Sequence, residues 1–150
     1  MRNGSLKRVI AIAMVLSVFT HSAIGGSVED GDAAYARGDY ESARLNWLPA
    51  AMAANSTAQY NIGFLYRLGQ GVTQDDRQAA YWFRQSAELG FAQAQLDLAT
   101  LYLLGLGVPR DFSESANWTR KAADQGHANA QYHLGTLYQR GYGVPKDKVL

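Results

Sequence analysis

An internal repetition with a fixed period of 36 residues constrains the fold more than any other feature of the sequence. Residues 58–93 and 94–129 are identical at 15 of 36 aligned positions, whereas chance would give roughly two with ordinary residue usage. A third copy opens at Ala130 and continues to residue 150. Self-similarity at a period of 20–50 residues is typical of stacked arrays of short structural units.

Each copy is predicted to form a helix, a glycine loop and a second helix. In residues 58–93, apolar residues recur at helical spacing with polar residues between them. Gly69 follows at the position where the end of a helix favours a left-handed residue. Gly71 gives the loop a second permissive residue. The pattern predicts that neighbouring helices run antiparallel.

The second helix of each copy is predicted to begin after an aspartate cap. Asp75 is followed three residues later by Gln78, and Asp111 by Glu114, so both copies carry a capping-box pattern. Small residues recur at fixed positions in both helices, and large aromatic residues such as Trp82 lie between them. This alternation predicts interlocking helix pairs with one continuous core. The expected fold is all-α, a solenoid of stacked antiparallel helix pairs.

The sequence before the clean copies is predicted to contain three segments. Residues 1–25 combine three basic residues, an uncharged apolar run from Val9 to Phe19 and a small-residue zone, which predicts a cleaved export signal. The apolar run is too short to cross a bilayer, which needs about 20 residues. Residues 26–32 are expected to be a flexible N-terminus, and residues 33–57 a degenerate helix pair that Pro49 kinks or divides.

The third copy is a partial repeat that covers residues 130–150. Its second helix is expected to begin at Asp147 and to reach only Leu150. A shortened gene, a fragment, and a helix face completed by a partner would each account for this pattern.

Composition excludes several classes of function. The chain has no cysteine, so a disulfide, a thiolate nucleophile and a cysteine-bound metal are excluded. Removing the three basic residues of the predicted signal from the 14 in the chain leaves 11 against 13 acidic residues, a net charge of −2. No basic stripe remains for a nucleic-acid backbone. We also expect no stable membrane insertion once the signal is cleaved.

The repeated pattern resembles that of a known family. Ala-x-x-x-Leu-Gly-x-x-Tyr-x-x-Gly-x-Gly-Val-x-x-Asp, followed by Ala-x-x-Trp and Ala-x-x-Gly, is similar to the sel-one-like repeat, a relative of the tetratricopeptide repeat (TPR) with a longer inter-helix loop. The resemblance covers about residues 33–150. It departs from the pattern at Ala99, where glycine is usual, and at Thr73, where proline is common. It implies a TPR-like superhelix that binds other proteins, with exported members that regulate or assemble the envelope.

The sequence contains no convincing catalytic or metal-binding set. His127 is expected to be a solvated residue of an inter-repeat turn, and paired carboxylates at ligand spacing are missing, so we predict no metal site. Acid–base catalysis needs a second, opposed carboxylate, and the pattern indicates none. The glycine loops lack the lysine and the preceding strand of a phosphate loop. We therefore predict no catalytic residues and no cofactor.

The candidate functional residues lie on one side of the first helix of each copy, at positions that are neither glycine nor core and that differ between copies. First helices line the concave side of stacked helix pairs, and tyrosine and arginine are common anchors of binding. The candidate protein-binding groove consists of Tyr60, Asn61, Phe64, Arg67, Leu96, Asp97, Thr100, Leu103, Tyr132, His133, Thr136 and Gln139.

The sequence thus predicts an exported, periplasmic or secreted, non-enzymatic repeat protein that docks a protein or peptide on a curved surface. An envelope hydrolase acting on peptidoglycan-like or lactam substrates is the main alternative, since the resemblance extends to members proposed to have such activity. A truncated remnant without function is the third. A pocket with converging titratable groups would favour the hydrolase, and an open groove would favour the docking protein.

Overall fold

The computed structural model describes residues 26–143, which form seven α-helices and no strand. The helices are α2 (Val28–Ala36), α3 (Tyr40–Met52), α4 (Ser56–Leu68), α5 (Asp76–Glu88), α6 (Ala92–Leu104), α7 (Phe112–Asp124) and α8 (Ala128–Arg140). The predicted export signal and the helix start expected at Asp147 lie outside the described residues.

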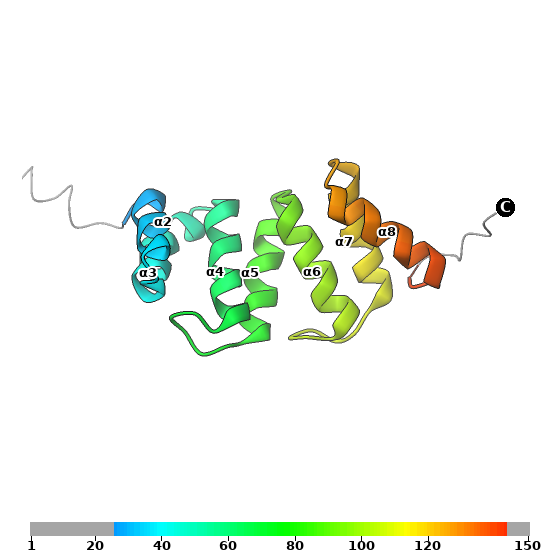
Figure 1. The fold of residues 1–150 in the computed structure, drawn as a ribbon, viewed down its shortest axis with the longest axis horizontal. Coiled ribbons are helices and arrows are strands. Elements are labelled where there is room, and N and C mark those ends of the chain that lie inside the picture. Colours follow the sequence, from blue (N-terminus) through cyan, green and yellow to red (C-terminus); the bar gives the residue numbers. More distant parts are fainter. Residues whose placement is uncertain (1–25, 144–150) are drawn as a thin grey trace, which may run out of the picture.

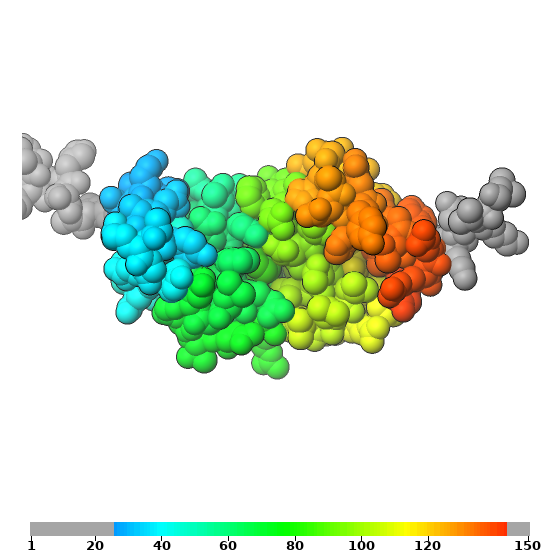
Figure 2. Space-filling model, in the orientation of Figure 1, coloured from blue at the N-terminus to red at the C-terminus, as the bar shows by residue number. Residues whose placement is uncertain are grey.

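The helices form a single row in which each packs against the next in the chain (Figure 1). α2 and α3 lie at one end of the row, and α8 lies at the other. Three pairs follow one another, α2/α3, α4/α5 and α6/α7, and α8 is the first helix of the next copy. The space-filling view shows an elongated body in which neighbouring pairs touch (Figure 2). The predicted all-α solenoid is confirmed.

The N-terminal pair begins earlier than the sequence predicted. α2 starts at Val28, so most of the segment expected to be flexible is helical. Ser27 and Asp30 form a capping box in which the Ser27 hydroxyl accepts from the Asp30 N–H at 3.0 Å and the Asp30 carboxylate accepts from the Ser27 N–H at 3.2 Å. Gly31 is buried beneath the indole of Trp47, which leaves no room for a Cβ. This glycine serves close packing rather than flexibility.

Pro49 does not divide the second helix of this pair. α3 runs as one helix through Pro49 to Met52. A proline lacks an N–H donor and crowds the carbonyl one turn earlier. Pro49 thus removes one hydrogen bond, the one to the Leu45 carbonyl, but α3 continues for three more residues, and the Ala53 N–H bonds to the Pro49 carbonyl at 3.1 Å.

The predicted helix ends are confirmed, but the capping boxes are only half formed. Gly69 ends α4 with φ of 67°. The Asp75 carboxylate accepts from the backbone N–H groups of Arg77 and Gln78 at 2.9 and 3.1 Å. The Asp75 N–H donates to the Tyr66 carbonyl instead of the Gln78 side chain. The loop is thereby tied to both helices of its own pair.

The second loop glycine of each copy packs against the preceding pair. Gly71 and Gly107 have φ of 65° and 68°, in the region that side chains avoid. A Cβ at Gly107 would overlap the backbone carbonyl of Asp76 at the start of α5, and one at Gly71 would overlap the backbone at Tyr40. These glycines therefore permit a close contact between neighbouring copies.

Repeated polar contacts also join each copy to the next. The side-chain amides of Gln59, Gln95 and Gln131 donate to the carbonyls of Ala51, Ala87 and Ala123 at 2.9, 3.1 and 3.4 Å. Each of these carbonyls lies in the last turn of the preceding helix and also accepts a backbone N–H from the turn that follows it. In the same way Arg84 donates to the Tyr102 hydroxyl and Arg120 to the Tyr138 hydroxyl. These contacts fix how one pair stacks on another.

Candidate functional site

Three hollows follow one another along the face formed by the first helices. The hollow between α2 and α4 has a volume of about 360 Å³ and includes Trp47 of α3. A hollow of about 90 Å³ lies between α4 and α6, with Phe83 of α5 at its floor. A hollow of about 210 Å³ lies between α6 and α8 and reaches Thr119 of α7. Each hollow thus sits where two copies meet, with a second helix behind it.

The structure places ten of the twelve predicted groove residues in the linings of these hollows. The α2/α4 hollow contains Tyr60, Asn61 and Phe64; the α4/α6 hollow contains Phe64, Arg67, Asp97 and Thr100; and the α6/α8 hollow contains Thr100, Leu103, Tyr132, His133 and Thr136. Gln139 is exposed on α8 and lines none of the three.

The assignment of Leu96 to the groove is wrong. Its side chain is 5% exposed and packs with Ala122 and Ala130 in a small buried cluster between α6, α7 and α8. α6 is apolar on most of its circumference, because helices press on it from both sides, so sequence spacing alone does not separate its outer face from its core face.

A hydrogen-bonded network crosses the face between the first two hollows. The Tyr60 hydroxyl donates to Asp97 Oδ2 at 3.0 Å, and Gln93 Nε2 donates to the same oxygen at 3.2 Å. Gln93 Oε1 lies 3.0 Å from Nε2 of His127. His127, which the sequence placed in a solvated turn, is half-buried and caps α8, since its Nδ1 accepts from the Ala130 N–H at 3.4 Å. The network couples α4, α6 and α8.

Burial governs the titration of this network. Removal from water raises the pKa of Asp97, and the hydrogen bonds from Gln93 and Tyr60 only partly oppose this effect. Burial beside the Asp97 carboxylate also raises the pKa of Tyr60 well above its usual range, so the phenol keeps its proton and acts as a donor.

Replacing Asp97 with asparagine is expected to raise the stability of the protein at pH 7. The pKa of the Asp97 carboxyl is higher in the folded state than its usual 3.8, so the protonated carboxyl favours the fold at pH values below 3.8. This contribution to stability is lost as pH rises through the pKa of the folded state. Asparagine keeps an acceptor for Tyr60 and Gln93 without the buried charge. Urea unfolding at pH 4–7 should show that the wild type loses stability relative to the variant as pH rises. Parallel curves would contradict this account.

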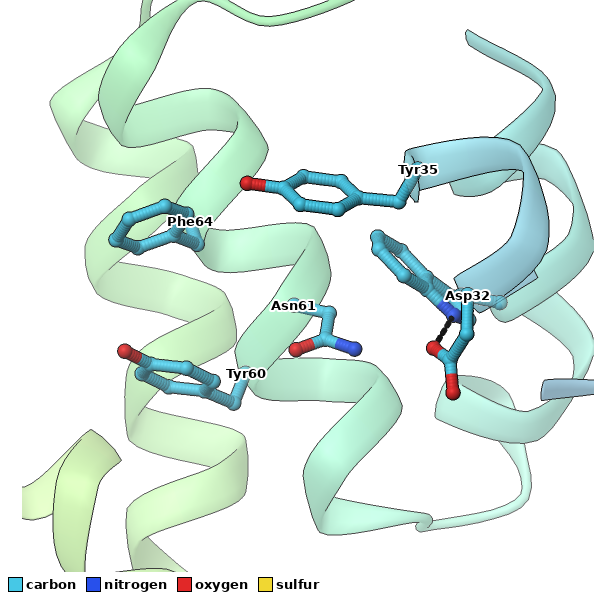
Figure 3. A pocket seen from close by; sticks show the side chains of 6 residues that line it. Asp32, Tyr35, Tyr60, Asn61 and Phe64 are labelled. Carbon is cyan, nitrogen blue, oxygen red and sulfur yellow. Dashed lines mark hydrogen bonds between the residues drawn. The ribbon is translucent and has the colours of Figure 1, made fainter. Parts of the chain in front are cut away.

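Sequence reasoning missed three residues of the α2/α4 hollow: Asp32, Tyr35 and Trp47 (Figure 3). Trp47 Nε1 donates to Asp32 Oδ1 at 2.9 Å. These residues belong to the divergent N-terminal pair, where no repeat register was available. An acidic and an aromatic residue three positions apart on a short helix were the only signal.

Residues 26–143 contain no group of three or more His, Asp or Glu side chains arranged to hold a metal ion. No helix in this part of the chain is long and apolar enough to cross a bilayer.

The fold and its period define a helical repeat protein whose pairs present one continuous face. The pattern of the Sel1 repeat family matches three adjacent segments, residues 56–91, 92–127 and 128–150, and the chain belongs to this family. The matched segments begin two residues earlier than the predicted copies and keep their order. Sel1 repeats generally mediate interactions between proteins.

Two solved structures show the same architecture. A Sel1 repeat protein from Oxalobacter formigenes is 37% identical with a TM-score of 0.75, over 78% of this chain and 48% of that one. A protective antigen present in uropathogenic Escherichia coli strains, which displays an SLR fold, is 36% identical with a TM-score of 0.69, over 71% of this chain and 23% of that one. This chain thus spans about half of the first protein and about a quarter of the second. No curated protein sequence matches it.

Proposed function

We propose that this chain is an exported, non-enzymatic docking protein that binds a protein or peptide partner across the face of its first helices, as an envelope regulator or assembly factor. The observation that carries the proposal is the row of three hollows from α2 to α8. An extended segment that crosses the parallel first helices would place side chains in successive hollows. Preformed concave sites with a few polar groups are typical of recognition surfaces.

Within the three hollows of the first-helix face, the distribution of carboxylates supports docking over hydrolysis. The α2/α4 hollow contains one carboxylate, Asp32, and the α4/α6 hollow contains one, Asp97. The α6/α8 hollow contains none among its lining residues. Acid–base chemistry on a glycoside or lactam uses a pair of groups that act on the same bond. Separate, single carboxylates suit partner recognition instead.

Two exposed tyrosines, one on a first helix and one on a second helix, offer a matched test. Tyr132 is 76% exposed beside the α6/α8 hollow, and Tyr81 is 53% exposed on α5. Each is replaced by the photo-crosslinking residue p-benzoylphenylalanine, a conservative aromatic change. After irradiation in an envelope fraction, we expect a defined adduct from Tyr132 that excess unmodified protein suppresses, and no such adduct from Tyr81. The same adduct from both positions, or none from Tyr132, would reject the docking role.

A further inference from the structure

We propose that the hollow between α2 and α4 binds the guanidinium group of an arginine side chain of the docked partner. This inference rests on the docking role proposed above and names the chemistry that one part of the face selects. The lining residues, which we call the aromatic hollow, are Asp32, Tyr35, Trp47, Tyr60, Asn61 and Phe64.

Two aromatic walls bound the aromatic hollow. On the N-terminal side the rings of Tyr35 and Trp47 lie 5.7 Å apart, and on the α4 side those of Tyr60 and Phe64 lie 6.1 Å apart. Among the described residues, no ring of one wall forms an aromatic pair with a ring of the other. The hollow that these rings line has a volume of about 360 Å³, and the Tyr35 hydroxyl points from the N-terminal side toward Phe64 (Figure 3). A planar cation stacks favourably on such ring faces.

One negative charge lies in the aromatic hollow without a cation to balance it. Oδ1 of Asp32 accepts from Trp47, and within residues 26–143 Oδ2 has no hydrogen-bond donor and Asp32 has no ion pair. The lining contains no lysine, arginine or histidine. The close view shows the Asn61 side chain between Tyr60 and Asp32, with its amide nitrogen toward Asp32 and its oxygen toward Tyr60 (Figure 3). The free carboxylate oxygen of Asp32 is an acceptor for a group that carries several donors.

The chemistry of the site favours arginine over other side chains. An apolar side chain would cover the Asp32 carboxylate without giving it a donor, which carries a desolvation penalty. An acidic side chain would be repelled by Asp32. The compact ammonium of lysine pairs with the carboxylate but does not stack as a flat plane on the face of an aromatic ring. The preference is local, because the α6/α8 hollow contains Arg140 and His133 and no carboxylate.

Nuclear magnetic resonance offers a direct test, since the chain contains only three tryptophans and one lies in the aromatic hollow. The probes are N-acetyl-arginine N-methylamide, its citrulline analogue, which is neutral and nearly the same shape, and the lysine analogue. We expect arginine to shift the indole N–H resonance of Trp47 with saturation in the millimolar range. Those of Trp82 and Trp118 should not move. Citrulline should bind at least about tenfold more weakly, because it lacks the charge.

The Asp32→Asn variant isolates the role of the charge. Asparagine keeps an oxygen that accepts from Trp47, so we expect the Trp47 ring to keep its position. Unchanged indole resonances of Trp82 and Trp118 would show that the fold is intact. We expect the variant to bind the arginine probe about tenfold more weakly. Equal binding of citrulline, tighter binding of lysine, or no effect of Asp32→Asn would each overturn the assignment of a guanidinium site.

The two proposals fail separately. If Tyr132 forms its adduct but Trp47 does not respond to arginine, the docking face stands and the guanidinium site is wrong. If Trp47 responds but Tyr132 forms no adduct, the hollow has the stated preference and the docking role is wrong.

Discussion

Replacing Gly107 with alanine is expected to reduce the free energy of unfolding by about 2–5 kcal/mol. The left-handed backbone at φ of 68° costs an alanine about 1–2 kcal/mol. Its Cβ would also overlap the Asp76 carbonyl at the start of α5, and relief of such overpacking costs about 1–3 kcal/mol. Because a backbone atom cannot rotate away as a side chain can, the neighbouring pairs have to separate. Urea unfolding followed by circular dichroism measures the loss.

Gly126→Ala is the matched control for this prediction. Gly126 also has positive φ, 82°, but a Cβ there would meet nothing within 4 Å. The control should therefore show only the backbone cost of about 1–2 kcal/mol. An equal loss for the two variants would mean that the contact between the loop and the preceding pair contributes nothing to stability.

Replacing Trp118 with alanine is expected to destabilise the protein by about 3–5 kcal/mol, the usual range for truncating a buried aromatic residue. Its side chain is 7% exposed and belongs to the same buried cluster as Leu98 and Tyr102 of α6. The Nε1 group donates to Glu114 at 3.1 Å, so the loss includes a hydrogen bond as well as the ring. The same unfolding assay measures the effect.

Two variants control for the size and position of this ring. Trp118→Phe keeps an aromatic ring and should cost clearly less than alanine. Tyr81→Ala removes a ring that is 53% exposed and should change stability by no more than about 0.5 kcal/mol. A cost below 1 kcal/mol for Trp118→Ala would contradict the view that the copies interlock through their aromatic residues.

The architecture was predictable from the sequence because the repeat compares one copy with another. Gly69 and Gly105 stand at the same position and both end a helix with a left-handed residue. Trp82 and Trp118 recur at the same helix position and are both buried. Agreement between independent copies separates structural positions from variable ones. A single copy would have left the glycine loops open to other interpretations.

The sequence was a poorer guide where no second copy exists. The start of α2 was placed five residues too late, at residue 33 instead of Val28, because residues 26–32 were interpreted as a flexible segment, whereas Gly31 within them lies under Trp47 from a different helix. The capping box from Ser27 to Asp30 was a local signal that could have revealed the start of this helix. The contact that favours glycine at position 31 is a tertiary one with Trp47, so the neighbouring sequence alone does not predict it.

The candidate face was predictable in outline but not in its details. Helical spacing placed Asn61, Phe64 and Thr100 on the side of their helices that lines the hollows. Spacing did not reveal that Tyr60 and Asp97 bond to each other across two helices, or that Leu96 turns into the core. Both outcomes depend on the angle and distance between neighbouring pairs, which a one-dimensional pattern does not contain.

The contacts between neighbouring copies repeat the same chemistry. A glutamine amide donates to a carbonyl in the last turn of the preceding helix, and a loop glycine packs against the backbone at the start of the second helix of the preceding pair. Each set of contacts is complete within two adjacent units. A gene could therefore gain or lose a 36-residue cassette by recombination, and the new neighbours would already fit. Such an event would lengthen or shorten the recognition surface and bring together residues that had not shared a hollow, so new specificity could arise without any change to the core.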